Sequence, residues 1–144
     1  MPFTKSALNQ YSRVGTESGV ANADPHRLIQ MLMEGALEKI SVAKGCMQRG
    51  EVSEKGRQIS WAISIINGLA AGLDMEKGGE IAQNLNALYD YMCGRLLESN
   101  IHNKVEYLDE VSELMHQIKA GWDAIPRILS GQPVSSANVA PGNR

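Results

Sequence analysis

Apolar residues recur every three or four positions along most of the chain between residues 24 and 126. This spacing is the period of one face of an α-helix, and no stretch alternates as a half-buried strand would. Glycine, proline and capping residues divide the pattern into four segments. The first segment begins at Asp24-Pro25, an N-cap followed by proline at the first helical position, and ends near Gly50. A second helix is expected to begin near Ser53.

The middle of the chain is interrupted by a pair of glycines, Gly78 and Gly79. Glycine tolerates the backbone angles that end one helix and allow a close approach before the next, so the second helix is predicted to end before this pair. The third helix is then expected to run from about Glu80 to Ser99. Its apolar stripe predicts the residues that hold the bundle together: Ile81, Leu85, Leu88, Met92 and Leu96.

The fourth helix follows Asn103, which is predicted to cap it in a capping box with Glu106. Pro126 is expected to end this helix, because its ring clashes with the carbonyl four residues back. The stripe between them alternates three and four: Leu108, Val111, Met115, Ile118, Trp122 and Ile125. Four such helices of about 20 to 25 residues, joined by short connections, predict an all-α, antiparallel up-down four-helix bundle.

The two ends of the chain carry too little apolar surface to fold alone. Residues 1–23 contain a short helical face with Leu8 and Tyr11, which must dock onto the bundle or stay disordered. Residues 127–144 are rich in Ser, Pro, Gly and Asn, a composition typical of disorder. The predicted organisation is therefore a partly mobile N-terminal cap segment, a bundle over residues 24–126 and a disordered tail.

Composition narrows the class of function. The chain has 144 residues, 43% of them hydrophobic, and a formal charge of -2 from 14 basic and 16 acidic residues. This balance favours neither nucleic acid nor an anionic membrane as a partner. No apolar run reaches the roughly 18 residues of a membrane span, and the first residues lack the apolar centre of a signal peptide. With two isolated cysteines, Cys46 and Cys93, the sequence predicts a cytoplasmic protein without membrane insertion.

The chemistry that such bundles often carry is only weakly represented. Di-metal bundles use two Glu-x-x-His motifs and two further glutamates, and this chain has one match, Glu113 to His116. A single motif supplies too few inward ligands, so no metal or other cofactor is expected. The two cysteines are expected to be small core residues rather than nucleophiles. No catalytic group is singled out, and the sequence does not predict an enzyme.

Several apolar side chains exceed what one helix seam needs. Leu28 and Met31 widen the apolar face of the first helix, and Ile65 lies off the stripe of the second. Methionine fills cores and also lines adaptable peptide grooves, with core filling favoured for most of the seven. Tyr89 belongs beside the core stripe, whereas Tyr91 lies toward a flank, where its ring could line a groove.

Three segments carry a resemblance to a known family, the flagellar secretion chaperones of the FliS family. They are Ala23-Asp24-Pro25 with the following LIQMLMEGAL, the stretch LDMEKGGEIAQNLNALYDYMCGRLLESN, and LDEV leading to Trp122. The resemblance spans residues 11–122. It implies a non-enzymatic helical bundle in the bacterial cytoplasm that binds the disordered C-terminal segment of flagellin, prevents premature polymerisation and aids delivery to the flagellar type III export gate.

The same resemblance implies that a short N-terminal segment packs over the bundle and gives way to the client, with Leu8 and Tyr11 at the packing positions. Together with the surplus apolar residues this predicts a partner-binding set: Leu8, Tyr11, Leu28, Met31, Ile65 and Tyr91. The alternative is a helical adaptor for another flagellar regulator or an export-gate component. The sequence leaves open whether the free protein is a monomer or a homodimer.

Overall fold

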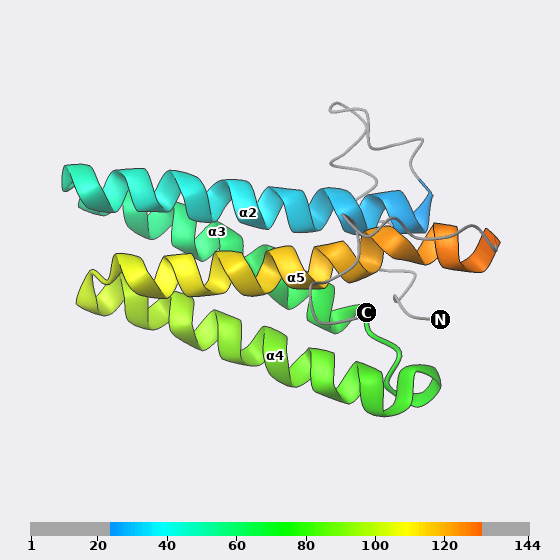
Figure 1. Ribbon diagram of the computed structural model, residues 1–144. Helices are drawn as coiled ribbons and strands as arrows, with labels where there is room; N and C mark the ends of the chain where they lie inside the picture. The colour runs from blue at the N-terminus through cyan, green and yellow to red at the C-terminus, as the bar shows by residue number, and fades with distance from the viewer. Residues whose placement is uncertain (1–23, 131–144) are drawn as a thin grey trace.

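The computed structural model describes residues 24–130 of the chain, and the side-chain surroundings of residues 24–125. Four helices run alternately up and down: α2 (Pro25–Arg49), α3 (Val52–Ala71), α4 (Met75–His102) and α5 (Val105–Ser130). Each helix packs against its neighbours in the chain, and α5 also packs against α2, which closes the bundle (Figure 1). The predicted all-α bundle is confirmed. The predicted roles of the two terminal segments fall outside the described residues.

The ends of α2 are set by the residues that the sequence indicated. The Asp24 carboxylate accepts a hydrogen bond of 2.8 Å from the backbone N–H of Arg27 and so caps the first turn. Gly50 closes the helix with φ 74°, and its N–H group bonds back to the carbonyl of Met47.

Helix α3 ends at Ala71, before the glycine pair as predicted, whereas α4 begins earlier than predicted. Asp74 caps a first turn of α4 by accepting hydrogen bonds from the backbone N–H groups of Glu76 and Lys77. A carboxylate that satisfies two free N–H groups is a start signal that the prediction missed. The glycine pair still interrupts the helix, because Gly79, with φ 53° and ψ -131°, is non-helical and kinks α4 between this first turn and the run that begins at Glu80.

The prediction for the start of α5 was also wrong. Asn103 does not cap α5; it closes α4 in the left-handed conformation, with φ 57°. Asparagine adopts this conformation more easily than most residues, and its side-chain oxygen accepts a hydrogen bond from the Lys55 ammonium at 3.1 Å instead. The helix also continues past Pro126 to Ser130, so the proline does not end it as predicted.

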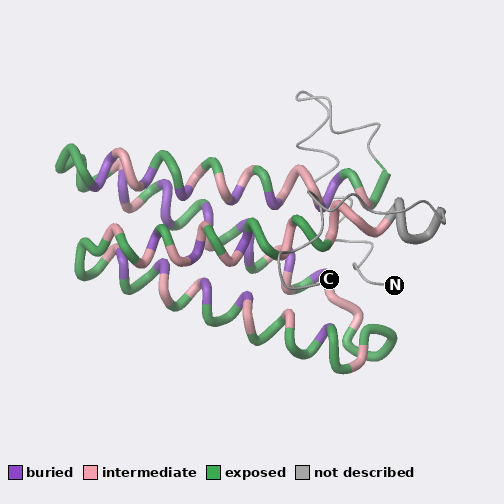
Figure 2. Tube along the Cα trace, viewed as in Figure 1, coloured by how far each residue is buried: buried purple, intermediate pink, exposed green. Residues whose placement is uncertain are grey.

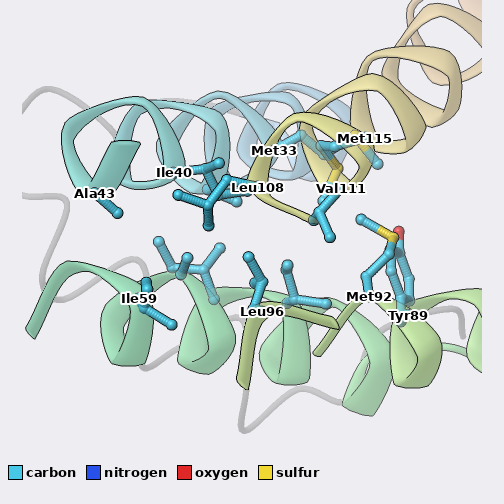
Figure 3. Close-up of a cluster of buried hydrophobic side chains, with 14 of the residues drawn as sticks. Met33, Ile40, Ala43, Ile59, Tyr89, Met92, Leu96, Leu108, Val111 and Met115 are labelled. Atoms are coloured by element: carbon cyan, nitrogen blue, oxygen red, sulfur yellow. The ribbon is translucent and has the colours of Figure 1, made fainter. Parts of the chain in front are cut away.

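Fully buried side chains run from the middle of the bundle toward the end where the α2–α3 and α4–α5 connections lie, here named the closed end. Figure 3 shows the buried side chains of all four helices meeting there and along the middle of the bundle. Met92 and Leu96 of the predicted α4 stripe are completely buried. Other large side chains are at most 2% exposed, among them Met33, Ile40, Ile59, Ile66, Leu108, Val111 and Met115. The prediction that most methionines fill the core is confirmed for Met33, Met92 and Met115.

Polar groups brace the closed end as well. Lys55 is only 6% exposed, and its ammonium group also donates to the backbone carbonyl of Asn100 at 3.1 Å. It therefore binds two acceptors at the C-terminal end of α4, where the helix dipole favours a positive charge. This contact ties the first turn of α3 to the last turn of α4.

At the opposite end of the bundle the predicted apolar stripe of α4 is less buried, and one of its residues does not belong to the core. Ile81 is 79% exposed, so its assignment to the core was wrong. Leu85 and Leu88 are half-buried, and Figure 2 shows exposed positions dominating the N-terminal part of α4. Here α4 stands away from α5, as Figure 1 shows, so the stripe has less to pack against. This is named the open end.

Within the described residues, no helix combines the length and hydropathy needed to cross a bilayer.

Candidate binding pocket

A cavity of about 350 Å³ lies at the open end, inside the bundle. Its walls come from the first turns of α2, the end of α3 and the residues just after it, α4 from Ile81 to its middle at Tyr89, and the C-terminal half of α5. The volume is at the lower end of the range for ligand pockets. It is lined by Ile29, Met33, Leu69, Gly72, Leu73, Ile81, Leu85, Tyr89, Gln117, Ile118, Gly121, Trp122 and Ile125.

Two of the walls are joined to each other by polar contacts between α2 and α5. The Trp122 indole N–H donates to the backbone carbonyl of His26 at 3.0 Å, and the two rings stack with centroids 4.8 Å apart. Beside them, the Gln30 side-chain amide donates to the Asp123 carboxylate at 2.7 Å. These contacts fix the indole plane, and they satisfy the indole N–H, so Trp122 presents an apolar surface to the pocket.

The α4 wall is held differently. Among the described residues, the first side-chain hydrogen bond from α4 to another helix involves Tyr91, two positions after the last pocket-lining residue of this helix, Tyr89. The pocket-lining part of α4 contacts the other described helices through apolar packing. Of the helices around the pocket, α2 and α5 are therefore joined to each other by hydrogen bonds beside it, whereas α4 between Ile81 and Tyr89 makes none to another described helix.

The chemistry of the pocket is almost wholly apolar. Gln117 contributes the one amide side chain of the lining, at an exposed position. Tyr89 is 2% exposed, and burial raises the pKa of its phenol to about 12, so the hydroxyl is uncharged at neutral pH. Such a surface binds apolar side chains and offers no nucleophile, base or cluster of charges for a reaction.

A separate polar cluster lies on the outer side of α4 and α5, toward the closed end. The Tyr91 hydroxyl donates to the Glu110 carboxylate at 2.5 Å, and the Arg95 guanidinium donates to the same carboxylate at 2.8 Å. These two hydrogen bonds, with that of Tyr91 the stronger influence, hold the pKa of Glu110 below its usual value. Arg95 also packs over the Tyr107 ring, 3.7 Å from its centroid. The cluster joins α4 to α5.

None of the four predicted partner-binding residues in the described part of the chain lines the pocket. Leu8 and Tyr11 fall outside the described residues. Leu28 and Ile65 are buried, at 4% and 8% exposure, Met31 is half-buried, and Tyr91 is 45% exposed within the polar cluster. No observation tests their contact with a partner, and it stays a prediction.

The pocket is built from residues that the sequence pattern assigned to the core or left unassigned. Leu85 and Ile118 lie on the predicted inward stripes, and both line the pocket. The sequence signal that could have identified an opening is the early break at Gly72 and Asp74. This break shortens α3 by several residues, so the apolar stripes of α4 and α5 extend beyond the end of α3 and are not covered by it there.

The weak metal motif and the cysteines take no part in this site. Glu113 and His116 are both exposed on α5, and the described residues contain no group of three potential metal-ligating side chains. Cys46 is buried. Cys93 is half-buried, and its own burial is the main cause that raises the pKa of its thiol to about 11, so this thiol stays protonated at neutral pH.

Comparison with known proteins places this architecture in a family. The family model described as flagellar protein FliS matches residues 7–128, most of the chain. The chain belongs to the FliS family of flagellar secretion chaperones. It is 50% identical over 123 residues to flagellar secretion chaperone FliSB of Pseudomonas aeruginosa, which covers 85% of this chain and 98% of that relative.

Two further relatives show how far the similarity extends. Flagellar secretion chaperone FliS of Salmonella typhimurium is 47% identical over 124 residues, covering 85% of this chain and 92% of the relative. The Bacillus subtilis protein of the same name is 28% identical over 106 residues, covering 74% and 78%. The family is one of chaperones rather than enzymes, and the predicted family resemblance is confirmed.

Proposed function

We propose that this family member binds the disordered C-terminal segment of flagellin through the pocket at the open end. The observation that carries the proposal is an apolar cavity of about 350 Å³ in a chain of the FliS family. A flagellin whose C-terminal segment is covered cannot polymerise through it. The chaperone then acts in the cytoplasm, where it keeps its client unassembled and aids delivery to the flagellar export gate.

The surface of the pocket suits such a client. A disordered segment that folds as an amphipathic helix presents apolar side chains at helical spacing, and an apolar groove binds these without a fixed pattern of charges. Burying three or four client side chains contributes about 1.5 to 3 kcal/mol each, and ordering the segment costs about 2 to 5 kcal/mol. A dissociation constant between micromolar and nanomolar is therefore within reach.

The N-terminal segment is proposed to cover the pocket until the client arrives. Tyr11 precedes the first described residue, Asp24, by 13 positions. An extended chain spans about 3.3 to 3.6 Å per residue, so Leu8 and Tyr11 can reach a pocket whose α2 wall begins at Ile29. Leu8 and Tyr11 supply an aliphatic and an aromatic side chain of the kind that fits an apolar lining.

This cover gives a direct prediction. The double variant Leu8→Ala, Tyr11→Ala is expected to keep the bundle folded and to change flagellin binding, since the segment competes with the client rather than supporting the core. Circular dichroism measures the fold and melting temperature, and isothermal titration calorimetry measures binding. A fall of the melting temperature by more than about 8 °C, roughly 1 to 2 kcal/mol for a domain of this size, would show that the two residues belong to the permanent core.

The remaining predicted contact residues lie on the outer surface or beneath it. Met31 and Tyr91 are accessible to a segment that continues beyond the pocket, whereas Leu28 and Ile65 are buried and become accessible only when neighbouring side chains move. We propose Met31 and Tyr91 as the outer contacts.

Calorimetric titration of the full-length protein with a flagellin C-terminal peptide tests the proposed function. Saturable binding with one peptide per chain is expected. A peptide of the same length with its apolar residues changed to serine is the matched control and is expected not to bind. No saturable binding at tens of micromolar (~-6 kcal/mol) would reject flagellin as the client and favour an adaptor role toward another flagellar component.

A further inference from the structure

Ile81 has an unusual position for a large aliphatic residue. It is 79% exposed, the most exposed of the large hydrophobic side chains in the described part of the chain, yet it lines the mouth of the pocket. The next residue, Ala82, is 4% exposed and lies close to Gly78 in the first turn of α4. The isoleucine lies at the mouth of an apolar cavity with most of its surface in water, where an apolar occupant would cover it.

The backbone beside Ile81 is shaped by the two glycines. Gly79 has φ 53° and ψ -131°, a combination that side-chain-bearing residues rarely adopt. A Cβ atom at Gly78 would lie 2.5 Å from the Cβ of Ala82, so this position permits the close approach of the first turn to the rest of α4. Glycine adopts this conformation without strain, so the pair can set the direction in which the rest of α4 leaves the first turn.

We propose that Ile81 is a client-contact residue of the pocket and that the Gly78–Gly79 kink positions it at the pocket mouth. This proposal rests on the proposed function and adds a residue that helical periodicity assigned to the core. The kink at Gly79 ends the first turn of α4, and the helix starts again at Glu80, which sets where Ile81 lies relative to the pocket. Between Ile81 and Tyr89 this wall makes no hydrogen bond to another helix of the described chain, so apolar contact with the client would add to its packing.

The contact is tested with two isoleucines of the same helix. Ile81→Ala removes side-chain atoms at the pocket, and Ile101→Ala removes the same atoms from a residue that is 65% exposed at the closed end, about 30 Å along the helix. Titration of the full-length variants with the flagellin C-terminal peptide is expected to show affinity reduced roughly ten- to fifty-fold for Ile81→Ala. Affinity is expected to change less than twofold for Ile101→Ala.

The positioning role is tested at Gly79. An added Cβ meets no atom within 4 Å there, so Gly79→Ala acts through the backbone and not through a steric clash. Gly94 lies inside the same helix, also with open space around an added Cβ, and Gly94→Ala is the matched control. Gly79→Ala is expected to weaken peptide binding at least fivefold, and Gly94→Ala is expected to leave it unchanged.

A double-mutant cycle separates positioning from a general structural effect. If Gly79 acts through Ile81, Gly79→Ala changes peptide affinity less than twofold once Ile81 is already alanine. If Ile81→Ala binds the peptide with wild-type affinity, or if the effects of the two substitutions are fully additive, the inference is overturned. The proposed function still stands in that case, because the wild type binds the peptide. A wild type that does not bind the peptide would overturn both, and that result is visible before any variant is measured.

Discussion

The difference between a closed and an open end predicts unequal effects of the same substitution within one helix. Leu96 is completely buried at the closed end, and Leu85 is half-buried at the wall of the pocket, eleven positions earlier in α4. Leu96→Ala and Leu85→Ala remove the same atoms. They differ in whether those atoms leave a sealed cavity behind.

The expected magnitudes follow from that difference. A sealed cavity adds to the lost transfer free energy, so Leu96→Ala is expected to reduce the free energy of unfolding by about 3 to 5 kcal/mol. At Leu85 the pocket is already open, and only part of the side chain is withdrawn from water, so the loss is expected to be about 1 to 2 kcal/mol. Leu97→Ala is the control, because this side chain is 52% exposed and its loss is expected to stay within about 0.5 kcal/mol.

Urea unfolding followed by circular dichroism measures all three variants. With a slope of about 2 kcal/mol per molar urea, Leu96→Ala shifts the midpoint by about 1.5 to 2.5 M and Leu85→Ala by about 0.5 to 1 M. An unchanged slope shows that the comparison reflects the native state. Equal shifts for the two buried-face leucines, or a larger shift at Leu85, would refute the view that one end is packed and the other open.

Two further predictions concern the polar contacts. Lys55→Met is expected to lower the free energy of unfolding by about 2 to 3 kcal/mol, because two acceptors at the end of α4 lose a charged donor. Lys44→Met, which removes one partner of an exposed ion pair, is the control and is expected to lower it by less than about 1 kcal/mol. Equal losses for the two variants would contradict the stabilising role of Lys55 at the closed end. Hydrogen bonds from Tyr91 and Arg95 depress the pKa of Glu110, so its contribution to stability is complete above the unfolded pKa of about 4.3 and is lost as pH falls through the lower folded value. Glu110→Gln is therefore expected to be less stable than wild type at pH 7 and to approach it near pH 3 in urea unfolding, and a stability gap that does not change with pH would count against this coupling.

Helical periodicity was sufficient to predict the bundle because four amphipathic stripes have few other ways to bury their apolar faces. The caps that failed were cases of competition. Asn103 could start α5 or end α4, and the choice was decided by Lys55, a residue far away in the sequence. Asp74 adds a helical turn before the glycine pair because its carboxylate satisfies two N–H groups, and the pair still interrupts the helix at Gly79.

The pocket could not be predicted in the same way. A stripe indicates the direction in which Ile81 or Ile118 points, and both do line the interior cavity. It does not indicate how far apart the helix axes lie, which depends on the length of α3 and on the kink at Gly79. The same pattern of residues therefore describes a filled core at one end and an unfilled one at the other.

The central claim, that the open end receives the client, is tested most directly by methyl nuclear magnetic resonance. Full-length protein labelled at the isoleucine δ1 methyl groups is titrated with the flagellin C-terminal peptide. We expect large chemical-shift changes at Ile29, Ile81 and Ile118, which line the pocket, and little change at Ile40 and Ile59, which are buried at the closed end. Saturable binding with unchanged pocket methyl groups, or with the largest changes at the closed end, would contradict the account.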